Sequence, residues 1–139
     1  MDQRLQQTVD FLRAHQHGVL STVSPDGMPE SAAIEYAVTD RLEIIFDTFN
    51  TYRKYKNIKL APHVSFVVFD ENATVQYEGK AYEIEGDAIL TFRRILYEQV
   101  PNAQKFAEQP ETRFFKITPE WIRFRDYSVN SEPLFELNL

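Results

Sequence analysis

The chain of 139 residues contains no cysteine, which excludes disulfide bonds, thiolate metal sites and a cysteine nucleophile. It has only four glycines, too few for a glycine-rich linker, and no GxGxxG or Walker-type phosphate loop. The longest apolar run covers residues 66–69, far short of the roughly 20 residues that cross a bilayer. The first residues lack the apolar stretch of a secretory signal. We therefore expect a cytoplasmic protein with no membrane partner.

Basic residues are outnumbered by acidic ones, since 15 Lys and Arg stand against 21 Asp and Glu for a net charge of −6. Nucleic acid binding needs a basic face for the phosphates, so no nucleic-acid partner is expected. Hydrophobic residues make up 43% and aromatic residues 14% of the chain, which is typical of a folded protein rather than a disordered one. The length fits one domain over residues 1–139.

Alternation and turn signals predict a mainly β chain with a few peripheral helices. Leu42, Ile44 and Phe46 show the period-2 alternation of a half-buried strand. The expected strands are 18–24, 28–38, 42–47, 64–69, 74–85, 113–118 and 120–127. The expected helices are one from near Leu5 to near Gly18, and those over 51–60, 87–99 and 103–108. Because the strands follow one another through short turns, we expect an antiparallel barrel or sandwich.

Single residues set several of these boundaries. Gly18 is expected to end the first helix in a left-handed conformation, and Asp87 to cap the helix over 87–99. Gly79 is expected to mark a bulge in its strand, and Pro119 to separate the last two strands. The tail 128–139 is polar before an apolar end, which predicts a loose segment or one that docks on a partner.

Residues 48–54 carry the clearest functional pattern, in which a strand ends, a hydroxyl-rich turn follows and a helix begins with two cations. The first N–H groups of a helix lack internal partners and favour an anion. Thr48 and Thr51 can donate hydroxyl hydrogen bonds, Arg53 can hold two phosphate oxygens, and Lys54 adds a positive charge. The pattern indicates a phosphate site. The alternative is a surface helix with solvated cations and Thr51 as an ordinary N-cap.

These residues resemble the FMN-binding split-barrel family of pyridoxamine 5′-phosphate oxidase-like proteins, where the segment reads T-N-x-x-S-R-K. Four further motifs follow the family's order and spacing. The matching stretches are TFNTYRK (48–54), then Asn57 with APHVSFVV (61–68), GVLSTV with DGMP (18–29), VQYEGKA (75–81) and FKITPEWIRF (115–124). The match spans about residues 10–127, nearly the whole chain.

The resemblance implies a mostly β, antiparallel split barrel of the FMN-binding type, with the flavin at the interface of a homodimer. It assigns the FMN phosphate to Thr48, Thr51, Arg53 and Lys54. It places strand 33–36, including Ile34 and Glu35, along the edge of the flavin ring. It also implies flavin contacts from Thr74 and Gln76, and from Trp121, Arg123 or Arg125 of the second subunit.

One departure narrows the expected function. Pyridoxine-phosphate oxidases of this family carry R-x-x-x-x-K before the phosphate helix, whereas the matching positions here are Ala32 and Ala37. We therefore expect a general FMN-dependent oxidoreductase or reductase for an unidentified small molecule, in which the flavin carries the hydride or electrons. The alternatives are a deazaflavin in place of FMN, a non-catalytic flavin-binding or sensing protein, and a split barrel without cofactor.

No metal site is expected from the histidines. His15 and His17 are two residues apart at a helix end and so face apart, and His63 is distant in the chain. No carboxylate lies at a metal-ligand spacing such as HExxH.

Overall fold

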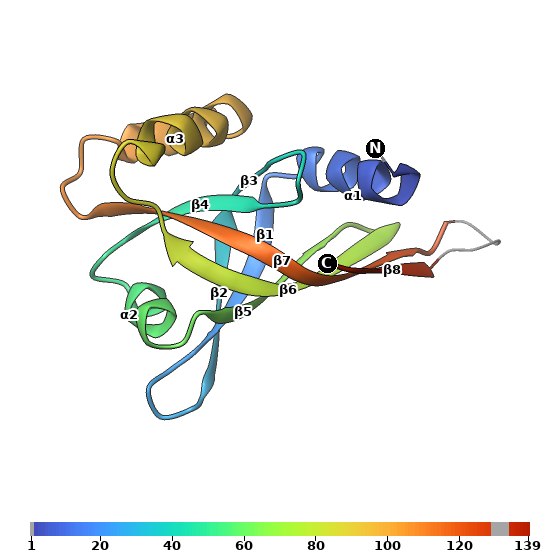
Figure 1. Ribbon diagram of the computed structural model, residues 1–139, viewed down its shortest axis with the longest axis horizontal. Helices are drawn as coiled ribbons and strands as arrows, with labels where there is room; N and C mark the ends of the chain where they lie inside the picture. Colours follow the sequence, from blue (N-terminus) through green and yellow to red (C-terminus); the bar gives the residue numbers. More distant parts are fainter. Residues whose placement is uncertain (1, 129–133) are drawn as a thin grey trace.

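The computed structural model describes residues 2–128 and 134–139 (Figure 1). Its strands form one antiparallel sheet in the order β2-β1-β5-β6-β7-β4-β3, with β8 paired to β7. The sheet curls into a split barrel, which confirms the predicted fold class. The strands are β1 (His17–Val23), β2 (Pro29–Glu35), β3 (Ala37–Val38), β4 (Ile44–Phe49), β5 (His63–Phe69), β6 (Ala73–Glu83), β7 (Thr112–Asp126) and β8 (Leu134–Asn138).

Helices lie outside the sheet, as expected from the sequence (Figure 1). They are α1 (Gln3–Arg13), α2 (Arg53–Leu60), α3 (Ala88–Gln99) and the 3₁₀ helix η1 (Pro101–Phe106). The predicted helix over 103–108 is thus a 3₁₀ turn that starts earlier, at a proline. Asp87 does stand at the N-cap of α3, but its side chain makes no capping hydrogen bond. None of the helices among the described residues is long and apolar enough to cross a membrane.

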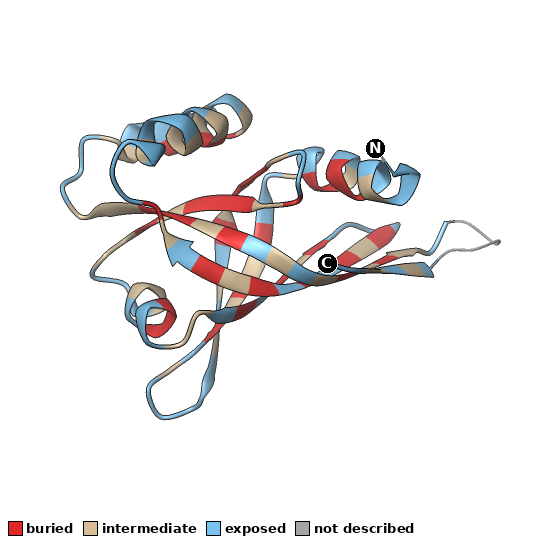
Figure 2. Cartoon of the chain, in the orientation of Figure 1, coloured by how far each residue is buried: buried red, intermediate tan, exposed pale blue. Residues whose placement is uncertain are grey.

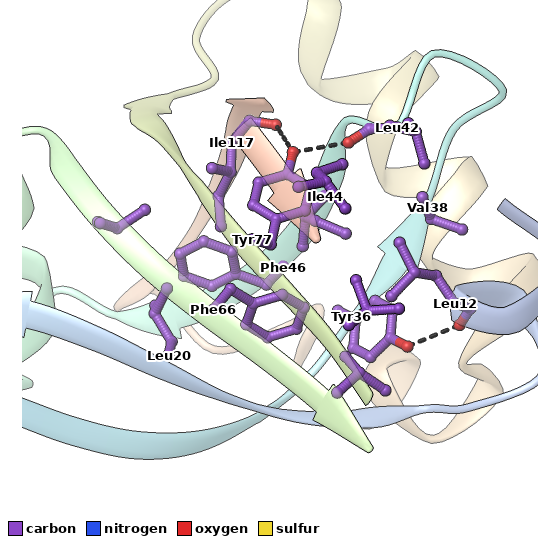
Figure 3. Packing of buried hydrophobic residues seen from close by; sticks show 14 of the residues in the cluster. Leu12, Leu20, Tyr36, Val38, Leu42, Ile44, Phe46, Phe66, Tyr77 and Ile117 are labelled. Atoms are coloured by element: carbon purple, nitrogen blue, oxygen red, sulfur yellow. Dashed lines mark hydrogen bonds between the residues drawn. The ribbon is translucent and has the colours of Figure 1, made fainter. Parts of the chain in front are cut away.

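Buried positions alternate with more exposed ones along β1, β5 and β6, and one face of these strands forms the main core (Figure 2). β3 and β4 are buried on both faces, because α3 covers the second face with a smaller core cluster. Two buried tyrosines satisfy their hydroxyls inside it (Figure 3). Tyr77 donates to the carbonyl of Leu42 at 2.6 Å and lies 3.1 Å from that of Ile117, and Tyr36 donates to the carbonyl of Leu12 at 2.6 Å. A buried hydroxyl without such a partner would cost free energy, so these bonds fix how the strands and α1 meet.

The predicted strand 28–38 is in fact two strands. β2 pairs with β1, and after Tyr36 the chain pairs as β3 with β4, at the opposite end of the sheet order. The chain itself therefore closes the barrel where Tyr36 turns its ring into the core. This switch depends on which strands are available for pairing, which the local alternation of residues 28–38 does not encode.

Two single-residue predictions were wrong for the same kind of reason. Gly18 lies inside β1 rather than at the end of α1, which stops at Arg13. A Cβ at Gly18 would lie 2.4 Å from the Phe66 ring, so the glycine is needed for a close approach and not for a turn. Pro119 does not divide two strands, because β7 runs through it and pairs it with Gly79. The predicted bulge at Gly79 is confirmed there, between Glu78 and Gly79.

The last residues of the tail are not loose, because they pack on their own chain. β8 pairs with β7 from Trp121 to Arg125, and Phe135 stacks on Phe124 with ring centroids 5.2 Å apart. Phe135 and Leu137 pack against the main core. Residues 129–133, which belong to the same predicted tail, lie outside the described part of the chain.

Candidate functional site

α2 follows β4 in the chain, and the residues at its start line pockets together with residues of β2 and β4. Two adjoining pockets there share Tyr52 and Lys54, and we call them together the anchor groove. The first pocket, about 180 Å³, is lined by Ala33, Ile34, Glu35, Asp47, Thr48, Phe49, Tyr52, Lys54, Phe106 and Thr112. The second, about 310 Å³, is lined by Leu20, Thr22, Glu30, Ser31, Ala32, Thr51, Tyr52, Arg53 and Lys54.

The predicted phosphate residues all line this groove. Thr48 is only 7% exposed, and its hydroxyl has no hydrogen-bond partner among the described residues. Its register opposite Arg113 on β7 holds it at the end of β4. Thr51 is exposed just before α2. The N-cap residue of α2 is Tyr52 rather than Thr51, and no side chain in the described part of the chain makes a capping hydrogen bond there. The first turn of α2 therefore keeps N–H groups that no side chain caps.

Lys54 is half-buried in the groove, and its ammonium lies 4.9 Å from the centre of the Tyr52 ring. Burial lowers the pKa of Lys54 because it disfavours the charged form, while the nearby Asp47 carboxylate acts in the opposite direction. The lysine is thus a desolvated cation, which gains more from an incoming anion than a fully hydrated one does.

Arg53 is held at the rim by an ion pair that the sequence did not reveal. Its guanidinium lies 3.2 Å from Glu30 on β2, and its side chain is 79% exposed. The buried Asn57 amide donates to Glu30 at 2.8 Å and to the Thr22 hydroxyl at 3.0 Å. In the sequence Asn57 stands out only as part of a family motif. In the structure its side chain is 2% exposed, and these two bonds satisfy its buried amide.

Sequence reasoning missed Asp47, which lines the groove directly before Thr48. Burial, with a smaller contribution from the Glu35 carboxylate, raises the pKa of Asp47 to about 6, while a backbone hydrogen bond and Lys54 act in the opposite direction. One carboxylate oxygen is buried without a hydrogen-bond partner in the described structure. The only signal was its position as the single charged residue in β4, IIFDTF.

Strand 33–36 reaches the groove only in part. Ile34 is buried and Glu35 half-buried, and both line the first pocket. Tyr36 turns away into the core, where its hydroxyl is bonded to Leu12. Ala37 is fully buried and packs under α3 with Leu96, so the fold leaves no room for a cation at that position.

The remaining predicted site residues lie elsewhere on the chain. Gln76 and Trp121 line a third pocket of about 210 Å³ on the outer face of the sheet, which we call the outer pocket. Its other lining residues are Val19, Ser21, Ser65, Phe66, Val67, Tyr77 and Glu78. Thr74 pairs with Arg125, whose Nε has no partner among the residues described.

The two groups are separated by strand β1. Leu20 and Thr22 line the anchor groove, whereas Val19 and Ser21 line the outer pocket. Successive residues of a strand point to opposite faces, so one chain does not bring the two groups together. Within residues 2–128 and 134–139, no group of three His, Cys, Asp or Glu side chains could hold a metal ion.

The family profile described as pyridoxamine 5′-phosphate oxidase matches residues 5–126, most of the chain. The chain belongs to the pyridoxamine 5′-phosphate oxidase family. The resemblance found in the motifs is therefore confirmed at the family level. No curated protein matches the chain in sequence.

Solved structures share the fold of this family member. A heme binding protein from Mycobacterium smegmatis matches 99% of the chain with a TM-score of 0.83 at 15% identity, and the chain spans 59% of that protein. A putative pyridoxamine 5′-phosphate oxidase from Listeria innocua matches 88% of the chain, at TM-score 0.74 and 22% identity over 98% of its own length.

General Stress Protein 26 from Bacillus anthracis matches 98% of the chain and 99% of its own length, at TM-score 0.73 and 24% identity. At these identities the three likenesses show the fold alone.

Proposed function

We propose that the anchor groove binds FMN through its phosphate and that the protein is a flavin-dependent oxidoreductase for a small molecule. The observation that carries the proposal is the Thr48 hydroxyl, which is buried, unpartnered among the described residues and on the same groove as Lys54. A buried polar group without a partner is costly, and an anionic oxygen would satisfy it.

The donors of the groove fit a phosphate. Thr48 and Thr51 supply hydroxyls, Lys54 supplies a desolvated charge, and Arg53 stands at the rim, where it can hold two oxygens. The flavin would supply hydride or electron transfer, while the protein binds and orients it. Ile34, Phe49 and Phe106 give the first pocket apolar walls that exclude water beside these donors.

The proposal does not extend to pyridoxine-phosphate oxidase activity. Ala32 lines the second pocket without a charge, and buried Ala37 cannot be replaced by a cation without disturbing the packing under α3. One pair of cations that true pyridoxine-phosphate oxidases carry is therefore missing, and Arg53 and Lys54 are the cations left to bind the phosphate beside the two threonine hydroxyls.

A homodimer would complete the site. Gln76 and Trp121 lie in the outer pocket, and they can approach a flavin in the anchor groove only from a second copy of the chain. We propose that the dimer surface includes the outer face of β1, β5 and β6 and meets the rim of the other copy's anchor groove, which would place Trp121 or Arg125 of the second subunit at the flavin. Thr74 and Gln76 would reach the flavin from this same face.

The visible absorption spectrum of the purified protein tests the proposal, before and after incubation with excess FMN and desalting. A retained flavin band is expected, and bleaching by NADH or NADPH would support an oxidoreductase. Retained flavin that no nicotinamide bleaches would favour a flavin-binding or sensing protein instead.

No retained band with FMN would overturn the proposal and favour a deazaflavin or a barrel without cofactor. Because a heme binding protein shares the fold, hemin is the second probe. A Soret band with hemin together with no retained FMN would assign the groove to heme.

A further inference from the structure

Asp47 places a carboxylate among the donors of the anchor groove. It follows Phe46 and precedes Thr48 on β4, on the strand face that packs under α3. One of its oxygens is buried without a hydrogen-bond partner in the described part of the chain. This partly buried carboxylate opposes the binding of an anion in the groove, because like charges repel strongly where water is excluded.

Three titratable groups face this carboxylate from three elements. Glu35 comes from β2, Lys54 from α2 and Tyr97 from α3. The Tyr97 hydroxyl is itself buried and unpartnered in the described structure, and burial and the Asp47 charge both raise its pKa. Of these groups only Lys54 is a cation, so Asp47 and an incoming phosphate would share the same positive charge.

The net charge of the whole groove also favours protonation of Asp47 when an anion binds. Its charged lining residues are the carboxylates Glu30, Glu35 and Asp47 and the cations Arg53 and Lys54. Three negative and two positive charges give a net −1 when all are ionised. One proton on Asp47 makes the groove neutral and leaves Lys54 free for the ligand.

We infer that Asp47 is a specificity-determining residue. It couples the binding of a phosphorylated flavin to the uptake of one proton and does not affect the binding of the unphosphorylated flavin. This inference rests on the proposed function. The phosphate and the Asp47 carboxylate compete for Lys54, so FMN binds the form of the groove in which Asp47 is protonated. Riboflavin has the same ring and ribityl chain but no phosphate, and therefore does not compete.

The size of the coupling follows from the Asp47 pKa of about 6. At pH 7.5, about 1.5 pH units higher, full coupling weakens FMN binding about thirtyfold, and at pH 5 the effect vanishes. The FMN phosphate also titrates near pH 6, which changes affinity in the opposite direction. A comparison between the protein and Asp47→Asn at each pH removes that contribution, because it is common to both.

The experiment measures the dissociation constants of FMN and riboflavin by quenching of flavin fluorescence at pH 5.0 and pH 7.5. Asp47→Asn is expected to bind FMN about thirtyfold more tightly than the unmodified protein at pH 7.5, and equally at pH 5.0. Riboflavin is expected to change less than about threefold at either pH. Glu71→Gln, which removes an exposed carboxylate in the β5–β6 turn, is the control for net charge.

A second variant tests the route through Lys54. In a Lys54→Met background the Asp47→Asn gain for FMN should shrink to less than about fivefold, since the shared cation is gone. Calorimetric titration of FMN at pH 7.0 in two buffers of different ionisation enthalpy should show proton uptake in the unmodified protein and less in Asp47→Asn.

The outcomes separate the inference from the proposed function. FMN binding with the same ratio between protein and variant at both pH values, or an equal gain for riboflavin, overturns the inference alone. Failure of both flavins to bind both the protein and the variant overturns the flavin proposal and the inference together.

Discussion

Charged residues at the anchor groove interact in pairs whose members lie on different secondary-structure elements. Arg53 forms an ion pair with Glu30, which lies 23 positions earlier in the chain. The carboxylate of Asp47, on the preceding strand, raises the pKa of Lys54 and so opposes the effect of burial. The cations alone were visible in the sequence as an adjacent pair at the start of a helix. Their partners were not, because an ion pair between two elements depends on how those elements are placed.

Removing both cations tests the phosphate anchor. Arg53→Ala combined with Lys54→Ala is expected to weaken FMN binding at least about a hundredfold, since charge-assisted hydrogen bonds are worth roughly 1.5–3 kcal/mol each. Fluorescence titration with FMN measures the loss, and Lys56→Ala on an exposed position of α2 is the control. Unchanged affinity in the double variant would place the phosphate elsewhere.

The stability of the protein without ligand should also report on Asp47. Its pKa is about 6 in the folded protein against an ordinary value of 3.8, so folding favours the protonated form. The contribution of Asp47 to the free energy of unfolding therefore falls as pH rises from about 4 to about 6 and then stays level.

Asp47→Asn removes that penalty. The variant is expected to be more stable than the unmodified protein by about 1–3 kcal/mol at pH 7.5, with no difference near pH 4. Urea unfolding followed by circular dichroism at both pH values measures this. An equal difference at the two values would mean that Asp47 titrates normally in the folded protein.

Elements of this fold are joined by pairings that local patterns could not foresee. Residues 28–38 alternate like one strand, yet they contribute to both ends of the sheet order. β7 is long enough to pair with β6 along its length and with β4 and β8 at its two ends. Phe135 and Leu137 of β8 thereby pack against the main core, and the exposed residues of β8 alternate with them.

The contribution of β8 can be measured with two neighbouring residues. Phe135→Ala removes a ring that stacks on Phe124 and is expected to lower the free energy of unfolding by about 1–3 kcal/mol. Leu134→Ala, at an exposed position of the same strand, should change it by less than about 0.5 kcal/mol. Similar effects of the two variants in urea unfolding would show that β8 is not held by Phe135.

At the scale of the whole molecule, the two groups of predicted site residues lie on opposite faces of β1. We therefore expect a homodimer in solution, formed through the outer face of β1, β5 and β6. Light scattering coupled to size-exclusion chromatography should give twice the mass of the chain. Val67→Arg, which places a charge in the outer pocket, should shift the protein to monomer and weaken FMN retention.

Leu90→Arg is the matched control, because it places the same charge on an exposed position of α3 away from that face. It should leave both the mass and the FMN retention unchanged. A monomer in the unmodified protein, or a dimer that Val67→Arg does not affect, would contradict this surface.

The sequence by itself determined the class of fold, the family and the grouping of hydroxyl and cationic side chains at the start of α2. Strand alternation, turn residues and the grouping of Thr48, Arg53 and Lys54 within seven positions are local features of the chain. They can therefore be interpreted without knowledge of the fold. The tertiary structure alone decided the switch at Tyr36, the ion pair of Arg53 with Glu30 and the burial of Asp47 beside Lys54. These depend on contacts between distant segments, and both the pKa of a carboxylate and the partner of a strand are set by what surrounds them.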